Sequence, residues 1–503
     1  MIYRLRVVKT ASGKKAVQVV RYGDSKTWVI KHLGSAANPK ELIELKRLAE
    51  EHIDRFQPQR SLFSTETELD GEDSSLVLIK NLEISSTNHR FAYEVFSRWY
   101  QGCGFSILNN QLLQDLVVAR LVEPASKLRS LKLLKQHFGI SYSPSRLYRL
   151  LKPLPALKSR VEEVAFNYVL GKNEKVVKLV FYDVTTLYFE SFKDDELRKC
   201  GFSKDHKFNQ PQVIIGLLVD KQGFPLGYDV FRGNVFEGHT FIPVILRFKE
   251  KYNLDNLTVV ADAAMISYTN ILALRDHGLS YIVAARIASM PLETIKQMAL
   301  YLDRDEKKYF KLDTKWGKLV CDFSKKRASK NKSDRLKQLR KAQEQLSKPN
   351  LVRHKTKFVK AVSKSKLVLN QALLAKAELL EGIKGYYTNL GNLPGELISQ
   401  RYHDLWRVEK AFRIAKSDLL ARPIYHHQET GIKAHILIVF VSLCVAKAME
   451  MSTNLSLQKI KDLVWQIHDI ELVDKLSGRT FTKRTTITDP LIHKLHQPAN
   501  STH

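Results

Sequence analysis

Five short apolar segments between residues 176 and 285 constrain the fold of this chain most. They read VVKLVFYD, QVIIGLLVD, PLGYDVF, LTVVAD and SYIVAA, and each has the length and β-branched content of a strand. Helical patterns follow the third and fourth segments, around residues 240–252 and 267–278. Strands that first succeed one another and then alternate with helices indicate an α/β fold with a mixed sheet covered by helices.

Two other patterns precede this sheet. Residues 3–34 alternate polar and apolar side chains around a Ser12-Gly13 turn, which predicts an N-terminal β-meander whose basic side chains either contact phosphates or are solvated. From about 92 to 170 the apolar period is 3.6, with breaks at Pro124 and Gly139. These short basic helices suit a helix-turn-helix-like DNA-binding unit, or equally a helical bundle with basic outer faces.

The stretch 300–375 departs from the α/β pattern. Its centre, KKRASKNKSDRLKQLRKAQEQLSK, is strongly charged and helical and lacks a clear apolar core, so we interpret it as an insertion. The α/β pattern resumes at 382–390, and we expect one helix across 396–418 and another across about 428–449.

The whole chain is thereby divided into six regions. They are a β-rich basic region (1–90), a helical and DNA-binding region (91–172), a first part of the catalytic core (173–295), the Lys-rich insertion (296–380), a second part of the core (381–455) and a C-terminal region (456–503).

The charge of the chain indicates a polyanionic partner. Its 81 Lys and Arg exceed its 52 Asp and Glu, which gives a formal charge of +29, as expected of a protein that neutralises phosphates. A ribosomal, RNA-modifying or membrane-surface protein would show a similar balance. Neither a P-loop signature nor an H-E-x-x-H motif occurs, so P-loop ATP hydrolysis and zinc peptidase chemistry lose their main sequence support.

Cysteine usage and hydropathy indicate a cytosolic protein. The four cysteines lie far apart without metal-ligand spacing, which argues against a disulfide framework or a structural zinc site. The longest apolar run, at 436–446, is shorter than the ~20 residues needed to span a bilayer, so we expect a buried helix and no membrane partner.

Three carboxylates stand where they can share metal ions. Two of the apolar strands end in Asp183 and Asp262, and a later amphipathic helix carries Glu409. Neighbouring strand ends and a packed helix can assemble the oxygen shell that Mg²⁺ prefers, and two such ions would support in-line attack on a phosphodiester. For any single aspartate, a turn or a helix cap is the more common explanation.

Tyr402 and Lys416 lie seven residues on either side of Glu409, so on one continuous helix the three side chains share a stripe. A lysine there could hold a phosphate near the metals. The plainer alternative is a solvated helix face with an i,i+4 pair from Glu409 to Arg413.

With these residues in place, the sequence resembles the bacterial insertion-sequence transposases of the family named after insertion sequence four, whose helix carries a Y-x2-R-x3-E-x6-K signature. Tyr402, Glu409 and Lys416 match this signature, and Leu405 stands at its arginine position. The contact made by that arginine would pass to Arg401, Arg407 or Arg413. The blocks FYDVTTLYFES, GFSKDHKFNQPQVIIGLLVDKQGFPLGYDVFRGN and VVADAAMIS also resemble successive core blocks of these transposases.

The resemblance implies a ribonuclease-H-like catalytic core interrupted by an insertion. It implies Asp183, Asp262 and Glu409 as catalytic metal ligands for two Mg²⁺ ions, with Mn²⁺ as a substitute, and Tyr402, Lys416, Arg407 and Arg413 as DNA-binding residues. The partners would be double-stranded DNA, as terminal inverted repeats and target, and a second copy of the chain in a homodimer. The protein would act in the bacterial cytoplasm, at the nucleoid when bound to DNA.

Two other functions share these features. One is a catalytically inactive, transposase-derived DNA-binding protein, and the other is a ribonuclease-H-like nuclease without strand transfer. Asp205, His206 and His239 fall within the resembling blocks and are candidates for positions near the metals, although loop histidines are usually solvated.

Overall fold

The computed structural model describes most of the chain, in two compact units. The first unit comprises Met1–Phe91 and Ile467–Ile487, and the second comprises Ala92–Gln466 and Thr488–His503. The described residues are 2–10, 14–23, 26–37, 39–54, 81–172, 176–190, 193–202, 209–265, 267–347, 356–362, 367–475, 477–485 and 489–496.

The first unit contains two small antiparallel sheets. Helix α1 (Pro39–Asp54) packs on the sheet β1-β2-β3, where Ala49 and Ile53 meet Val17 and Val19. The second sheet has the order β16-β15-β4, so two of its strands come from the C-terminal region of the sequence. The strands are β1 (Ile2–Lys9), β2 (Lys15–Gly23), β3 (Lys26–Ala36), β4 (Leu82–Asn88), β15 (Asp469–Asp474) and β16 (Thr480–Arg484).

An eight-stranded sheet forms the centre of the second unit, in the order β10-β11-β14-β9-β8-β5-β6-β7. Strand β5 pairs parallel with β8, and β8 with β9, while the other pairings are antiparallel. The mixed α/β sheet predicted from the sequence is thus confirmed. The strands are β5 (Leu179–Tyr188), β6 (Gln212–Asp220), β7 (Pro225–Arg232), β8 (Thr258–Ala261), β9 (Ser280–Ala285), β10 (Phe310–Thr314), β11 (Gly317–Phe323) and β14 (Ile383–Thr388).

The Lys-rich stretch extends this central sheet. Its strands β10 and β11 join the sheet through β14, which follows it in the chain. Helix α9 (Leu292–Leu302) leads into this stretch, which also contains the helices α10 (Lys325–Ser347) and α11 (Gln371–Leu379) and the hairpin β12 (Val359–Ala361) and β13 (Leu367–Leu369).

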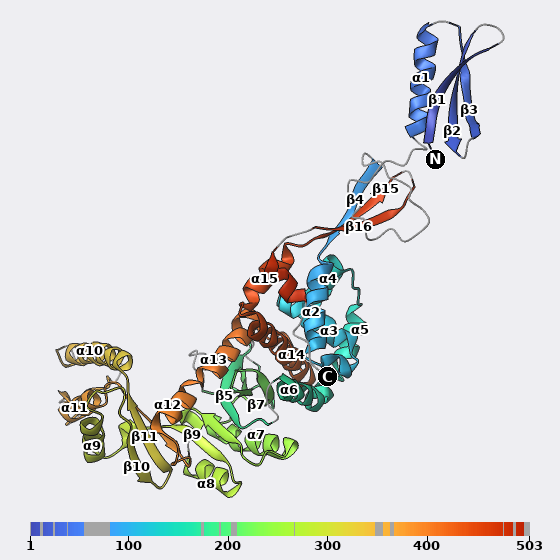
Figure 1. The fold of residues 1–503 in the computed structure, drawn as a ribbon. Coiled ribbons are helices and arrows are strands. Elements are labelled where there is room, and N and C mark those ends of the chain that lie inside the picture. The colour runs from blue at the N-terminus through green and yellow to red at the C-terminus, as the bar shows by residue number, and fades with distance from the viewer. Residues whose placement is uncertain are drawn as a thin grey trace. The chain divides into compact units, whose positions relative to one another are not determined.

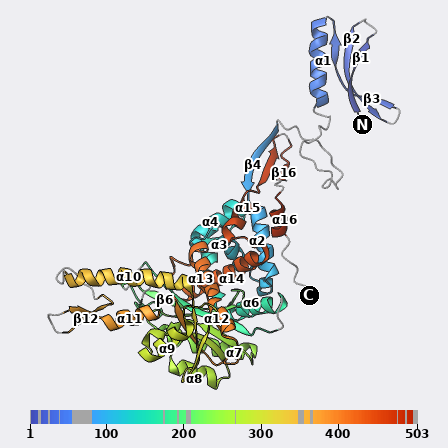
Figure 2. The ribbon, with the colours of Figure 1, turned by 60° about the vertical axis from the view of Figure 1, so that its left-hand side comes forward.

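Helices cover the sheet on both faces (Figures 1 and 2). On one face, the hydroxyl of Tyr182 in β5 donates to Thr240 of α7 at 2.8 Å. On the other face, α13 packs on β5 and β6, and α14 packs on β7. The helices around the sheet are α7 (Glu237–Tyr252), α8 (Tyr268–Asp276), α12 (Gly395–His403), α13 (Trp406–Arg413) and α14 (Glu429–Thr453).

Helix α14 is the central helix of the unit. By length and composition it could cross a membrane, but 94% of its most apolar 18-residue window is buried inside the protein, as in a core helix. It packs against α3 and α6 as well as the sheet. The remaining helices are α2 (Arg90–Gly102), α3 (Gln111–Val122), α4 (Lys127–Phe138), α5 (Pro144–Leu151), α6 (Lys158–Lys172), α15 (Leu457–Trp465) and α16 (Pro490–His496).

Two local expectations from the sequence are wrong. The single helix expected across 396–418 is broken: α12 ends at His403, α13 begins at Trp406, and a π-helical turn covers Ile414–Asp418. The strand expected to end at Asp183 continues to Tyr188. It does so because residues beyond Tyr182 keep pairing with β6, while the parallel pairing with β8 stops at Tyr182.

The contact between Tyr182 and Gly216 tests how tightly this sheet is packed. A Cβ at position 216 would overlap the buried phenol of Tyr182, so Gly216→Ala should lower the free energy of unfolding by roughly 1–3 kcal/mol, measured by chemical denaturation. Gly171→Ala is the matched control, because a Cβ there meets nothing within 4 Å in helix α6. Equal stability of both variants and the wild type would contradict this packing.

Candidate active site

Asp183 and Asp262 lie side by side on the central sheet. The parallel register pairs Tyr182 with Ala261, so the two aspartates are the next residues along adjacent strands, which lie ~4.8 Å apart. Each carboxylate accepts the backbone N–H of the residue after it, Val184 at 2.8 Å and Ala263 at 2.7 Å. Two acidic groups thus stand at the point where β8 ends.

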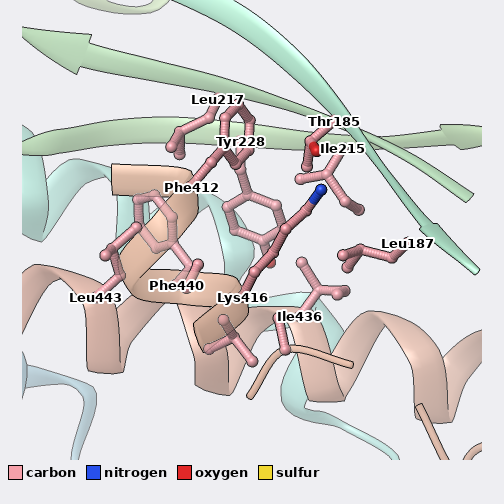
Figure 3. Close-up of a pocket in the computed structure, with 13 residues that line it drawn as sticks. Thr185, Leu187, Ile215, Leu217, Tyr228, Phe412, Lys416, Ile436, Phe440 and Leu443 are labelled. Carbon is pink, nitrogen blue, oxygen red and sulfur yellow. The ribbon is translucent and has the colours of Figure 1, made fainter. Parts of the chain in front are cut away.

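Asp183 shares a face of β5 with Thr185 and Leu187, because side chains alternate along a strand. Thr185 and Leu187 line a mainly apolar pocket together with Phe412 of α13 and Lys416 of the π-helical turn (Figure 3). Asp183 therefore faces the same layer of helices that carries Glu409.

Tyr402 connects α12 to the second aspartate. Its hydroxyl donates to Oδ1 of Asp262 at 3.2 Å. Burial raises the pKa of Tyr402, and the charges of Asp262 and Glu409 raise it further, so both carboxylates act on this phenol. Glu409 itself is exposed on α13.

Lys384 of β14 is a site residue that the sequence reasoning missed. Its Nζ lies 4.4 Å from the ring centroid of Tyr402. Burial lowers the pKa of Lys384 and Arg327 adds to this effect, whereas Asp262, Asp322 and Glu409 oppose it. The lysine thus brings a positive charge close to two of the three candidate metal ligands. The sequence contains no signal for it, because the contact depends on how β14 pairs with β9.

Buried Asp322 of β11 anchors the helix that carries Tyr402. It accepts hydrogen bonds from Tyr386 at 2.9 Å, from Arg327 at 2.8 Å and from Ser399 of α12. His403 at the end of α12 is 3.7 Å away. Burial alone would raise the pKa of Asp322, but the interactions with His403, Ser399 and Arg327 outweigh it and hold this pKa far below its usual range.

Lys416 does not lie on a stripe with Tyr402 and Glu409, because the helix is broken between them. Its side chain is half-buried and runs between apolar side chains of the sheet and of α14, with its nitrogen pointing toward Thr185 (Figure 3). A role in holding phosphate stays a prediction for this residue.

The other predicted DNA contacts differ in their surroundings. Leu405, at the signature's arginine position, is buried, so this position faces the core. Arg407 forms an ion pair with Asp404 at 3.1 Å, and Arg413 is exposed at the end of α13.

Three candidates from the resembling blocks remain. His239 is exposed in the first turn of α7 and packs on Phe236. Asp205 and His206 lie outside the described residues.

The three carboxylates have the chemistry of a magnesium site, since Mg²⁺ prefers oxygen ligands. In the described part of the chain, however, no three His, Cys, Asp or Glu side chains converge closely enough to hold a metal ion. Asp262 is instead hydrogen-bonded to Tyr402, and Lys384 lies beside that pair.

The anchoring role of Asp322 leads to a stability prediction. Asp322→Asn should lower the free energy of unfolding at pH 7 by roughly 2–4 kcal/mol, because it leaves Arg327 without its anion. Since the pKa of Asp322 is depressed in the folded state, its contribution is present above the unfolded-state pKa of 3.8 and is lost as the pH falls through the folded pKa. The difference between wild type and variant in denaturant titrations should thus shrink in acid.

Asp313→Asn is the control for this variant, because Asp313 lies exposed on the neighbouring strand and pairs only at the surface with Lys318. It should remain close to wild type at every pH. A similar loss in both variants would mean that Asp322 is no special anchor.

Comparisons with known proteins identify the family. The family model described as the transposase DDE domain matches residues 178–445, more than half of the chain. One similar solved structure is the piggyBac transposase synaptic complex with hairpin DNA, with 10% identity over 74% of this chain and 70% of that chain and a TM-score of 0.39. Another is the Mos1 transposase paired-end complex with left transposon end, with 13% identity over 48% of this chain and 70% of that chain and a TM-score of 0.16.

No curated protein matches the sequence. The two structural similarities are too low to support a conclusion, whereas the family match covers the central sheet from β5 to β14, the helices α12 and α13 and the first part of α14. The chain therefore belongs to the transposases with a DDE domain.

Proposed function

We propose that this transposase mobilises a bacterial insertion sequence by cutting DNA at the element ends and joining the freed 3′-hydroxyls to target DNA. The observation that carries the proposal is the register of β5 and β8, which brings Asp183 and Asp262 together on the face covered by α13. The resemblance of Tyr402, Glu409 and Lys416 to the signature of the insertion-sequence-four family supports the same function.

Asp183, Asp262 and Glu409 are the proposed ligands of two Mg²⁺ ions, which Mn²⁺ can replace. When bound, such ions polarise the phosphate and lower the pKa of an attacking water or hydroxyl. The protein's own groups have supporting roles. Tyr402 holds Asp262 in place through its hydroxyl, and the Asp322 anchor fixes the helix from which Tyr402 extends.

Double-stranded DNA is the proposed partner, both as terminal inverted repeats and as target. The net charge of +29 supports it, because Lys and Arg side chains neutralise phosphates. We further propose a homodimer that holds both element ends in the bacterial cytoplasm.

The carboxylates are tested by cleavage and joining of a DNA fragment that bears the inverted repeats flanking the gene. With Mg²⁺, the variants Asp183→Asn, Asp262→Asn and Glu409→Gln should each lose about 10³-fold or more in cleavage rate, because metal ligation is worth several kcal/mol in the transition state. Glu293→Gln removes an exposed carboxylate outside the site and serves as the matched control.

Retained cleavage in any of the three variants would remove that residue from the site. Cleavage by the wild type without joining would favour a nuclease. DNA binding without cleavage would favour an inactive DNA-binding protein.

We also propose that Lys384 supplies the positive charge that the arginine of the family signature would supply, since Leu405 stands at that position. Lys384→Met should reduce cleavage by about 10- to 100-fold, the value of a hydrogen bond to a charged group, without lowering the thermal midpoint. Lys384→Arg should recover part of this loss. Lys360→Met is the control, since Lys360 is exposed on β12. Equal cleavage by Lys384→Met and the control would contradict the assignment.

A further inference from the structure

A basic pocket lies outside the candidate active site, where α4 begins. It has a volume of about 610 Å³ and is lined by the first turn of α4, by Tyr148 of α5, by the segment Tyr425–His426 and by His435 of α14. We call it the α4 pocket. Its volume lies in the range of sites that hold one small ligand.

Basic side chains are buried at this pocket. Lys127 is 5% exposed, and its Nζ lies 3.4 Å from Nδ1 of His435, which is 4% exposed. The other ring nitrogen of His435, Nε2, lies 2.9 Å from the carbonyl of Ala421, to which it donates. His435 is thus a neutral acceptor for Lys127 and brings no negative charge.

Arg120 adds a second buried cation behind Lys127. It is 2% exposed and donates to the backbone carbonyls of Leu419, Leu420 and Ala125, and its Nε has no hydrogen-bond partner among the described residues. These carbonyl groups accept from Nη1 and Nη2 of Arg120 but do not neutralise its charge.

Among the described residues, the hydrogen-bond partners of Lys127 and Arg120 are a histidine and backbone carbonyls, and neither cation pairs with a carboxylate. Burial lowers the pKa of Lys127 well below its usual range, and Arg120 lowers it further. Burial likewise lowers the pKa of His426 to about 4, with Lys127 and Arg120 as the next causes. Glu123, which is near in sequence, pairs with exposed Arg129 at 3.2 Å.

Burial of a cationic group without a counter-charge costs folding free energy or drives the group toward its neutral form. Because these buried cations do not stabilise the fold, binding of an anion from solution is the better explanation for their presence. The N-terminus of α4 adds to the attraction, because the first-turn N–H groups and the helix dipole favour a negative charge there. Ser126 caps this helix by accepting the N–H of Arg129.

The rim of the pocket is aromatic. Tyr148 is 46% exposed and Tyr425 is 63% exposed, and both line the pocket. Exposed aromatic rings next to a basic groove are platforms on which nucleobases stack. The pocket therefore combines basic groups that can bind a phosphate with aromatic rings on which a base can stack.

We propose that the α4 pocket binds one nucleotide unit of a DNA strand, with its phosphate at Lys127 and the first turn of α4 and its base against Tyr148 or Tyr425. This proposal rests on DNA as the partner of the transposase, but not on cleavage.

Lys127→Met tests the phosphate site. We would measure thermal unfolding of the full chain with and without inorganic phosphate, and DNA binding in EDTA as a function of salt. Phosphate should stabilise the wild type but not Lys127→Met, and DNA affinity should fall about tenfold, with the slope of log K against log salt reduced by about 0.9. Without ligand, the variant should be at least as stable as the wild type, a result that a purely structural lysine would not give.

Lys135→Met is the matched control, because Lys135 is exposed on the same helix. If both variants respond to DNA like the wild type, the proposal is wrong. If Lys127→Met loses only its response to inorganic phosphate, the pocket is a site for the free anion and the DNA proposal is likewise wrong. Because EDTA prevents metal-dependent cleavage, absence of transposition in the separate cleavage assay would not affect this result.

The double variant Tyr148→Ala and Tyr425→Ala tests the stacking surface and avoids any effect of a buried substitution on folding. DNA affinity should fall about fivefold or more, while the thermal response to inorganic phosphate should stay as in the wild type. Unchanged DNA affinity would overturn the nucleotide assignment even if Lys127→Met failed to fold.

Discussion

The parallel pairing of β5 with β8 is the constraint on which the site depends. Parallel strands point the same way, so residues that leave the pairing at Tyr182 and Ala261 continue at the same edge. Asp183 and Asp262 are brought together there although 78 residues separate them in the sequence. The antiparallel pairing of β5 with β6 continues beyond that point, which keeps Asp183 on a strand paired on one side and fixes the face toward which it points.

The break between α12 and α13 lets the two helices make different contacts with the sheet. Helix α12 is fixed to the sheet through Ser399 and Asp322, and its Tyr402 reaches Asp262. Helix α13 packs separately on β5 and β6 and carries Glu409. On one straight helix, the positions of Tyr402 and Glu409 relative to each other would be fixed by the helix geometry. Because Leu405 is buried at the break, an arginine at this position would carry its charge into the core.

The sheet was predictable because strand patterns are local. The sequence placed both aspartates at strand ends, but only Asp262 follows its strand, whereas Asp183 lies within β5. Glu409, Tyr402 and Lys416 came from a spacing that assumes a straight helix, and the π-helical turn places Lys416 between sheet and α14 instead. Lys384 and the Asp322 anchor could not be found from the sequence. They depend on strands β11 and β14 joining the sheet beside β9, a long-range pairing that no local periodicity records. The same is true of β4 and β15, whose pairing joins residues near 85 and 472.

Part of the positive charge of the chain lies in the interior of the protein. Arg120 is buried behind the α4 pocket and donates to the carbonyls of Leu419 and Leu420, directly after the π-helical turn that contains Lys416. An anion in the pocket would act on Lys127 and Arg120 together, because the two are electrostatically coupled. Arg120 thus connects Ala125, at the α4 pocket, to the end of the segment that follows Glu409, because it donates to backbone carbonyls of both segments.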